Sequence, residues 1–330
     1  MRRILVAATW IGGFLLAFTT AIIVAFAVSP WPSVFLISMA FAGNDAGSES
    51  ALEKHVPAGL TVHNDVAYAE GPDEVLDLVL PADVGADLPV VLWVHGGGYI
   101  GGSKDGVANY LKILAAQGFA VAGMNYSTAP GATYPTPVRQ VAAALQFLTD
   151  DSQNLRIDAN RIVLAGDSAG AQIAAQAALI VTDPEYAAAI GIEPSIRDDQ
   201  LKGTVLVSGA FDMTALDVVG GIEGWFVKTV LWSYSGVRDF MNDEQFQSAS
   251  ITPNVSSNFP PTFITSGDAD PLEPQARALY RKLKELGVDV EALFFDAGPR
   301  LQHEYQFNLD TVEGQEAFRR SVSFIKRVTH

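Results

Sequence analysis

The chain has 330 residues, 49% of them hydrophobic, so it is long enough to bury the core of one large α/β domain. Its formal net charge is −16 at pH 7, and so acidic a surface repels phosphate backbones, which argues against a nucleic-acid partner. Cysteine is absent, which excludes disulfides, thiolate metal sites and cysteine nucleophiles.

The amino-terminal segment is far more apolar than the rest of the chain. After Arg3 the next charged residue is Asp45, and residues 4–28 are long enough as a helix to cross a hydrocarbon core of about 30 Å. We expect residues 1–43 to form a membrane anchor with its span at about 4–28, so that membrane lipid is one partner. The following segment at 33–42 is expected to lie in the interface or pack on the body of the protein, with a hairpin as a further alternative. The arginines before the span and the acidic residues after it favour a main body outside the cytoplasm.

Cleavage of this segment is the alternative. The apolar part of a signal peptide usually has about 7–15 residues, which is shorter than the run found here. Ala25-Phe26-Ala27 and Ala40-Phe41-Ala42 nevertheless have the small-residue pattern of cleavage sites. Cleavage at either place would give a secreted protein.

A small polar linker is predicted at residues 44–60, and alternating strands and helices follow it in one domain at residues 61–330. The first two strands are expected to pair as an antiparallel hairpin. Continuous apolar strands separated by helices predict a mostly parallel central sheet with helices on both faces. The predicted strands are residues 61–69, 75–80, 88–94, 120–125, 162–165, 205–208, 262–265 and 290–295, and the predicted helices are residues 107–116, 138–148, 169–179, 276–286 and 312–328.

One connection is too long for a single crossover helix. More than fifty residues separate the strand that ends near Ser208 from the strand that starts near Thr262. We therefore expect a lid inserted at about residues 210–258. Its aromatic residues could line an acyl pocket, rest on a membrane or only pack the insertion; they are Trp225, Phe226, Trp232 and Tyr234.

The most informative motif is Gly166-Asp167-Ser168-Ala169-Gly170, which lies between a predicted apolar strand and a helix of small residues. Strand, G-x-S-x-G and helix together form a nucleophile elbow, in which a strained turn exposes the serine hydroxyl at the top of a sheet. The two glycines are needed because the turn brings neighbouring backbone too close for a Cβ. Ser168 is the predicted nucleophile.

A serine hydroxyl is a poor nucleophile at neutral pH and needs a base. Of the five histidines, His303 is the one that follows the last predicted strand. Loops after parallel strands gather at the carboxyl edge of the sheet, where the elbow also opens. The other four lie before the fold, in the opening strand, on the glycine loop or at the chain end: His55, His63, His95 and His330.

The base needs a carboxylate to set its tautomer and stabilise the imidazolium. Asp268 and Asp270 both follow the preceding strand, and the chain order Ser, Asp, His is that of an α/β-hydrolase. We favour Asp270 because Pro271 stiffens its turn, and we expect Asp268 to hold the loop through backbone amides. Asp212, after an earlier strand, is a third choice.

An oxyanion formed during acyl transfer needs preorganised donors. His95-Gly96-Gly97-Gly98 directly follows the strand at residues 88–94, and glycines there let backbone N–H groups approach a substrate. The expected donors are the amides of Gly97, Gly98 and Ala169. We expect His95 itself to brace its loop.

Together these motifs resemble the hormone-sensitive-lipase-like branch of the α/β-hydrolases, the bacterial carboxylesterases that carry His-Gly-Gly-Gly. The resemblance covers about residues 60–328, and Tyr126-Ser-Thr-Ala-Pro130 is similar to a further segment of that family. Ser127, Gly131 and Glu304 depart from its pattern, Glu304 standing where the family usually has glycine. Residues 101–105 also look like the feruloyl and acetyl-xylan esterase-like subgroup. The family implies ester hydrolysis through an acyl-enzyme, without a cofactor.

The sequence therefore predicts a membrane-anchored serine hydrolase that cleaves carboxylic esters of short to medium acyl chains. Two alternatives remain. The same groups could cleave amides, as in an arylformamidase or a peptidase. The chain could also be an inactive hydrolase-fold binding module at the membrane, which the intact Ser168, Asp270 and His303 argue against. Nothing in the sequence indicates an oligomeric state or a metal site.

Overall fold

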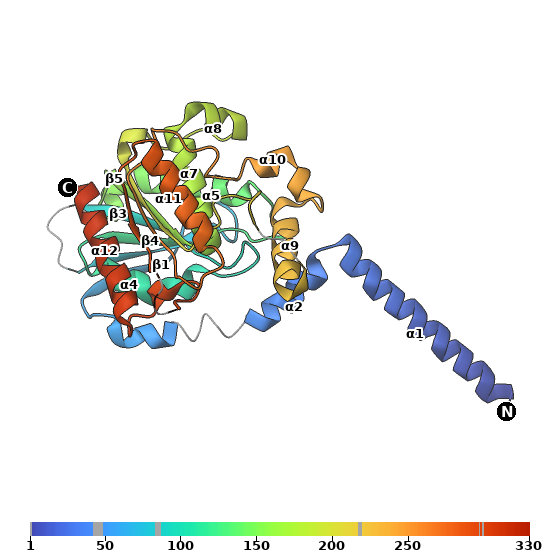
Figure 1. Ribbon diagram of the computed structural model, residues 1–330. Coiled ribbons are helices and arrows are strands. Elements are labelled where there is room, and N and C mark those ends of the chain that lie inside the picture. Colours follow the sequence, from blue (N-terminus) through green and yellow to red (C-terminus); the bar gives the residue numbers. More distant parts are fainter. Residues whose placement is uncertain (1, 42–48, 83–86, 217–219, 297, 299) are drawn as a thin grey trace.

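An eight-stranded sheet forms the centre of the computed structural model, which describes residues 2–41, 49–82, 87–216, 220–296, 298 and 300–330 (Figure 1). The strand order is β1-β2-β4-β3-β5-β6-β7-β8. The β1–β2 and β2–β4 pairs are antiparallel, and all other neighbouring pairs are parallel. This topology confirms the predicted α/β-hydrolase fold with a mostly parallel sheet and an opening hairpin.

The predicted strands agree with the observed ones in number and place. The largest difference is β5, which starts five residues earlier than predicted because Ile157 and Asp158 already pair with the start of β3. The strands are β1 (Leu60–Ala67), β2 (Val75–Pro81), β3 (Leu88–Val94), β4 (Ala120–Met124), β5 (Ile157–Asp167), β6 (Leu201–Val207), β7 (Thr262–Thr265) and β8 (Val290–Leu293).

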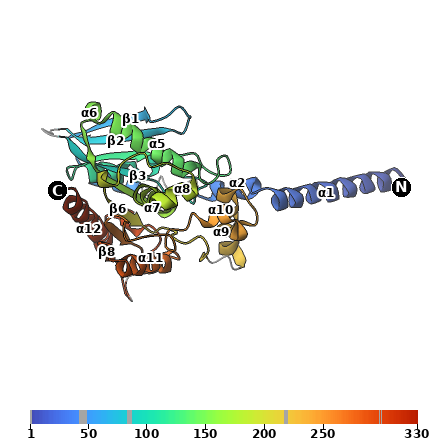
Figure 2. The same ribbon diagram turned by 90° about the horizontal axis from the view of Figure 1, so that it is seen from above.

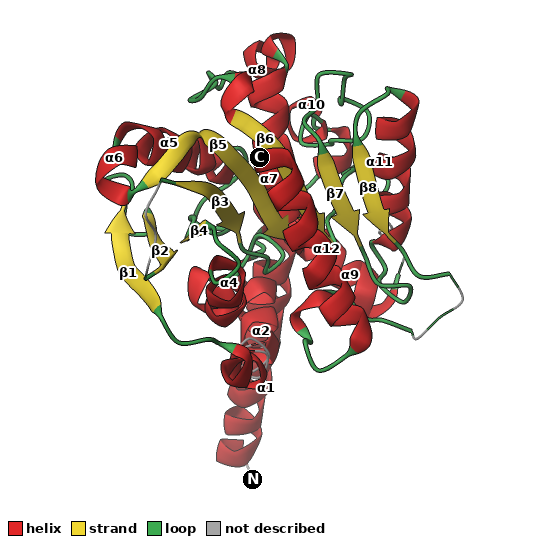
Figure 3. Ribbon diagram, turned by 90° about the vertical axis from the view of Figure 1, so that its left-hand side faces the viewer, coloured by secondary structure: helices red, strands yellow, loops and turns green. Residues whose placement is uncertain are grey.

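Helices cover both faces of this sheet. On β3, Val90 and Leu92 face a core shared with α5, α7 and α11, whereas Val91 and Trp93 face a core shared with α4 and α12. Figure 3 shows the hairpin at one edge of the sheet and β8, next to α11, at the other. The helices are α1 (Arg2–Val28), α2 (Trp31–Phe41), α4 (Ala108–Ala115), α5 (Thr136–Asp150), α6 (Ser152–Leu155), α7 (Ser168–Thr182), α8 (Pro184–Ile190), α9 (Gly221–Ser235), α10 (Glu244–Gln247), α11 (Glu273–Glu285) and α12 (Val312–Thr329).

The two amino-terminal helices differ in their relation to the domain. α1 extends away from it, whereas α2 packs against α9 and buries Val34 and Ile37 in the main core (Figures 1 and 2). Among the described residues, no helix taken alone is both long and apolar enough to cross a membrane. The bent pair Gly12–Val28 and Trp31–Met39, with 91° between its arms, has the required length and composition.

Part of the predicted linker at residues 44–60 packs onto the domain. Residues 49–52 are helical, a 3₁₀ turn follows at Glu53–His55, and Leu52 is only 2% exposed. The Glu49 carboxylate accepts a hydrogen bond of 2.9 Å from the backbone N–H of Asn109 in α4. Residues 42–48 lie outside the described part of the chain, so the boundary between anchor and linker stays a prediction.

The predicted lid corresponds to the connection between β6 and β7. In its described part it contains α9, a 3₁₀ turn at Phe240–Asn242, and α10. Buried side chains on α9, among them Leu231 and Tyr234, join the main core. This anchoring places α9 at the same end of the domain as α2 (Figure 1).

Candidate active site

Ser168 lies on the tight turn between β5 and α7. Its φ is +50°, a left-handed conformation that costs a non-glycine residue about 1–3 kcal/mol and that the surrounding packing must impose. A Cβ on Gly166 would come within 2.6 Å of the Gly170 backbone and 2.7 Å of the Val94 carbonyl oxygen. The glycines of the motif are therefore required by the close approach of β5, α7 and β3, and the turn presents the serine hydroxyl at the carboxyl edge of the sheet.

His303 bridges Ser168 and Asp270. Its Nε2 is 2.9 Å from the Ser168 Oγ, and its Nδ1 is 3.0 Å from the Asp270 Oδ2. The three residues come from the loops or turns that follow β5, β7 and β8. With Nδ1–H donating to Asp270, the Nε2 lone pair is directed at the serine hydroxyl and can accept its proton.

Asp270 is held by donors that the sequence analysis missed. The Ser266 hydroxyl donates to its Oδ2 at 2.8 Å, and the Leu272 amide donates to its Oδ1 at 2.9 Å. Its side chain is fully buried. Ser266 opens the strand-end motif Ser-Gly-Asp-Ala-Asp, and its place four residues before the acid was the available signal.

Asp268 and Asp212, the other two candidates for the acid, have different partners. Asp268 accepts hydrogen bonds from the backbone N–H groups of Leu301 at 2.6 Å and Arg300 at 3.2 Å, so it fixes the loop that carries His303. Asp212 accepts from the amide and hydroxyl of Thr214. The structure thus brings Asp270, and neither of these two, onto the imidazole.

Charges in the site favour a protonated imidazole beside an ionised acid. Burial alone would raise the pKa of Asp270, but the hydrogen bond and charge of His303 and the Leu272 amide outweigh it, so this pKa is lowered. Burial alone would lower the pKa of His303, but the Asp270 hydrogen bond and the charges of Glu304 and Asp270 outweigh it, so this pKa is raised. Asp270 therefore stays a carboxylate while His303 gains and loses a proton.

The three predicted oxyanion donors lie on the glycine loop after β3 and at the start of α7, and a Cβ on the neighbouring Gly96 would come within 3.1 Å of the Ser168 Cβ. Gly97 and Gly98 have φ values of +109° and +59°, and Ala169 lies in the first turn of α7, where the helix dipole favours negative charge. In the turns and loops of the described residues, none of these three amides donates to a backbone carbonyl. They are thus available to an oxyanion formed next to Ser168.

His95 braces the glycine loop from inside. Its Nδ1 is 2.7 Å from the Gly96 carbonyl oxygen, its ring stacks on Tyr126 with centroids 4.3 Å apart, and the Tyr126 hydroxyl donates to the His95 carbonyl at 3.0 Å. Burial lowers the pKa of His95 to about 4, so the ring is neutral at physiological pH. These contacts agree with the bracing role expected for it.

A carboxyl pair, Asp167 and Glu304, lies behind the serine and the histidine. Asp167 is 2% exposed and accepts hydrogen bonds of 2.7 Å from the Trp93 indole and from the Gly96 amide. Burial, and the Glu304 carboxylate beside it, raise the pKa of Asp167 well above its ordinary value. Glu304 Oε1 is 3.7 Å from His303 Nε2. The sequence analysis noted Glu304 only as a departure from a family pattern.

α9 covers the glycine loop. The space beside the Gly98 Cα faces Val230 and Phe226 of α9, with the nearest atoms 3.7–4.0 Å from an ideal Cβ position. Tyr234, fully buried, stacks on Tyr99 with centroids 4.0 Å apart, so it is a packing residue. Trp225 remains 40% exposed. Of these aromatic residues on α9, Tyr234 thus belongs to the core, Phe226 lies over the glycine loop and Trp225 lies at the surface.

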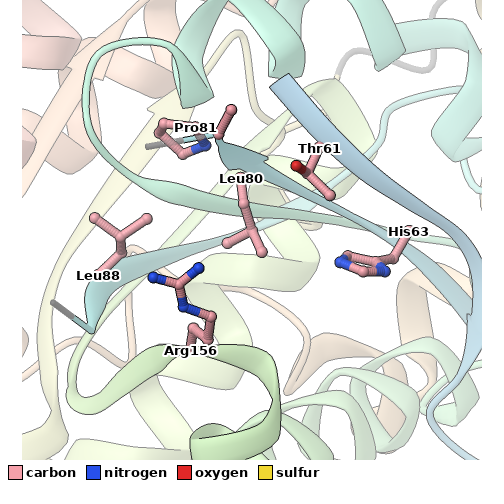
Figure 4. A pocket seen from close by; sticks show the side chains of 7 residues that line it. Thr61, His63, Leu80, Pro81, Leu88 and Arg156 are labelled. Atoms are coloured by element: carbon pink, nitrogen blue, oxygen red, sulfur yellow. The ribbon is translucent and has the colours of Figure 1, made fainter. Parts of the chain in front are cut away.

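A pocket at the opposite end of β3 has no part in this site. It is lined by residues of β1, β2 and the start of β3, with the Arg156 side chain across from them, and has a volume of about 100 Å³ (Figure 4). Among the residues that the structure describes, no group of three or more His, Asp or Glu side chains could hold a metal ion.

The chain is similar to known proteins both in sequence and in structure. The family model BD-FAE matches residues 76–283. Carboxylesterase NlhH of Mycobacterium tuberculosis is 28% identical over 274 residues, which cover 80% of this chain and 82% of that protein. Esterase B from Lactobacillus rhamnosis superposes with a TM-score of 0.80, at 22% identity over 91% of this chain and 96% of that one. An esterase from Pyrobaculum calidifontis superposes with a TM-score of 0.71, at 21% identity over 89% of this chain and 93% of that one.

The choice of Asp270 over Asp268 can be tested by the reactivity of Ser168 toward a fluorophosphonate. Asp270→Asn keeps the size of the side chain but favours the wrong imidazole tautomer, so labelling should slow by about 10³- to 10⁴-fold. Asp268→Asn loses at most one loop hydrogen bond, so labelling should slow by about tenfold or less. The rate is measured by in-gel fluorescence, and equal slowing in both variants would contradict the assignment.

Proposed function

Because this chain belongs to the BD-FAE family, and because a hydroxyl, an imidazole and a carboxylate meet at the carboxyl edge of its sheet, we propose that it hydrolyses carboxylic esters through an acyl-enzyme on Ser168. The observation that carries this proposal is the 2.9 Å separation of His303 Nε2 from Ser168 Oγ. The carboxylesterase activity named for the mycobacterial relative supports the same reaction class.

The reaction follows from the positions of the groups. His303 takes the hydroxyl proton at Nε2 as the Ser168 Oγ attacks the ester carbonyl, and Asp270 stabilises the imidazolium. The amides of Gly97, Gly98 and Ala169 donate to the oxyanion. The proton on Nε2 then passes to the departing alcohol. Water then attacks the acyl-enzyme while Nε2 takes its proton, and that proton passes to the Ser168 Oγ as the acid is released.

The acyl group is proposed to be short to medium in length. Supporting this, Phe226 and Val230 of α9 lie close above Gly98, where an acyl chain would pass the oxyanion donors. Large side chains at that place limit the room for a long chain near the reacting carbon.

The amino-terminal helices are proposed to hold this enzyme on a membrane, with the catalytic domain outside the cytoplasm. The bent pair Gly12–Val28 and Trp31–Met39 has the length and composition needed to cross about 30 Å of hydrocarbon, and α1 supplies its longer arm. Phe14, Leu16 and Ile23 on it are 70%, 71% and 63% exposed, an apolar surface that water does not favour. Secretion after cleavage of this segment is the alternative.

Replacing Ser168 tests the reaction. Ser168→Ala removes the nucleophile but changes no packed group, so p-nitrophenyl acetate hydrolysis should fall by about 10⁴-fold or more while circular dichroism stays unchanged. Ser257→Ala, at an exposed serine, is the control and should keep full activity. Substantial residual activity in the Ser168 variant would refute the mechanism, and a wild-type enzyme that prefers a formyl-anilide or a peptide amide over the ester would refute the substrate class.

Fractionation of cells that produce the full chain tests the anchor. The protein should stay with membranes in alkaline carbonate, dissolve in detergent and retain residues 1–43 by mass, because an uncleaved span is held by the hydrophobic effect. A fluorophosphonate that cannot cross membranes should label Ser168 in intact cells. Active protein in the medium that lacks the first residues would favour the secreted alternative, and labelling only after lysis would contradict the proposed orientation.

A further inference from the structure

The outer side of α2 and the start of α9 form an exposed apolar face, here called the roof face. α2 contains no charged residue, and its inner side is packed into the domain through Val34 and Ile37, which are 6% and 5% exposed. Its outer side carries large apolar side chains with nothing over them in the described part of the chain. The members of the roof face and their exposures are Trp31 58%, Phe35 64%, Leu36 49%, Met39 65%, Ile222 84% and Trp225 40%.

The roof face lies next to the site. α9 carries Ile222 and Trp225 at its start, followed by Phe226 and, one turn later, Val230, which face Gly98 of the oxyanion loop. α2 packs directly against this helix. A surface that covers the roof face is therefore close to the place where an ester would approach Ser168.

The direction of α1 indicates what covers this face. Only Ser29 and Pro30 separate α1 from α2, and α1 leaves the domain on the side where α2 and α9 lie (Figures 1 and 2). Because α2 is fixed to the core by buried side chains, the short connection leaves the domain little freedom to turn away from the base of α1. A bilayer that holds α1 would thus meet the roof face, and tryptophan is favoured at such an interface.

We propose that the roof face rests on the lipid bilayer and that the enzyme takes its substrates from it: esters of a short to medium acyl group with an apolar, membrane-dissolved alcohol. This rests on the proposed ester hydrolysis and membrane anchor. An ester in the bilayer then reaches the site beneath α9 without first crossing water.

Two esters of the same acid test this proposal with the full chain in phosphatidylcholine vesicles. Ethyl butyrate is water-soluble and hexadecyl butyrate resides in the bilayer, and released butyric acid is titrated for both. The double variant Phe35→Ser/Met39→Ser should lower hydrolysis of hexadecyl butyrate about tenfold or more, because it removes apolar contact with lipid, and should leave ethyl butyrate within about twofold. Val312→Ser, at a side chain 78% exposed at the start of α12, should change neither.

The results of this experiment distinguish the role of the roof face from the proposed ester hydrolysis. Equal loss on both esters, or no loss on either, would overturn the role of the roof face, as would a wild-type enzyme that cleaves ethyl butyrate but not hexadecyl butyrate. A wild-type enzyme that cleaves neither ester would instead contradict the proposed ester hydrolysis.

A second and independent observation concerns Glu304. Its backbone adopts the left-handed conformation, with a φ of +59°, directly after His303. Its Oε1 lies 3.7 Å from Nε2, the nitrogen that also contacts Ser168, whereas Asp270 lies on the opposite nitrogen. A carboxylate is thus close to each ring nitrogen.

Glu304 lies beside Asp167, and the difference in burial between these two acids decides which of them favours the charged form. Asp167 is the more buried acid, and burial and the neighbouring Glu304 raise its pKa well above its ordinary value, whereas the Glu304 side chain is 30% exposed to solvent, which favours a charged carboxylate there. A small cleft lined by both acids and by the glycine loop gives Glu304 its contact with solvent. Other titratable groups that face this cluster are His95, which is neutral, Tyr110 and Tyr126, and Asp270 beyond the ring.

The geometry points to Glu304 as a positioning residue that stabilises the imidazolium when Nε2 carries the serine proton. The proton moves from Ser168 Oγ to Nε2, and the new N–H⁺ develops beside the Glu304 carboxylate. Asp167, itself held by the Trp93 indole and the Gly96 amide, lies beside that carboxylate. The same ring is thereby stabilised from both sides.

Glu304→Gln, which keeps the shape but removes the charge, tests this role on a water-soluble ester. A carboxylate near the ring favours imidazolium, so its loss should move the acid limb of the kcat/KM profile to lower pH and reduce kcat by about 3- to 10-fold, with KM little changed. Glu304→Asp keeps a carboxylate and should retain the limb nearer to that of the wild type. Glu285→Gln, an exposed charge at the end of α11, controls for net charge.

An acid limb that stays in place in Glu304→Gln would overturn this role, and so would equal movement in Glu285→Gln or in Glu304→Asp. A purely structural role predicts lower thermal stability without movement of the limb.

Discussion

The hydrogen bond between His303 Nε2 and the Ser168 hydroxyl is the contact on which the proposed chemistry depends. It joins two positions 135 residues apart in sequence, and no local structure produces it. It forms because β5, β7 and β8 run parallel, so the segments that follow them meet at one edge of the sheet. The loop that carries His303 is in turn fixed by Asp268, and the loop that carries Asp270 is fixed by Ser266 and the Leu272 amide.

The strands along the chain and the meeting of Ser168, Asp270 and His303 could be predicted because each depends on a local signal: an apolar run, a glycine-flanked turn, or a polar residue directly after a strand. The supports of the site could not be predicted in this way. The contact between Asp167 and Glu304 depends on how far the turn after β5 approaches the loop after β8, and hydrophobic periodicity carries no such distance. Glu304 was visible only as an unusual residue at its position.

The two ends of the site are built on different physical grounds. At the imidazole, charge dominates, because Asp270 and Glu304 lie on opposite sides of a ring whose pKa their presence raises. At the roof, packing dominates, because Tyr234 stacks on Tyr99 and Phe226 lies over Gly98. We therefore expect substitutions at the imidazole to change the pH profile of activity, and substitutions at the roof to change the choice of substrate.

The docking of α2 makes the stability of the domain depend on whether this helix is retained. Val34 and Ile37 belong to the main core, and burial of each such side chain contributes about 1.5–3 kcal/mol, against a total stability of about 5–15 kcal/mol for a domain. A peptidase that cut at Ala25-Phe26-Ala27 would leave this helix in place. A cut at Ala40-Phe41-Ala42 would remove it, expose the outer surface of α9, and release a domain with a large part of its folding free energy gone.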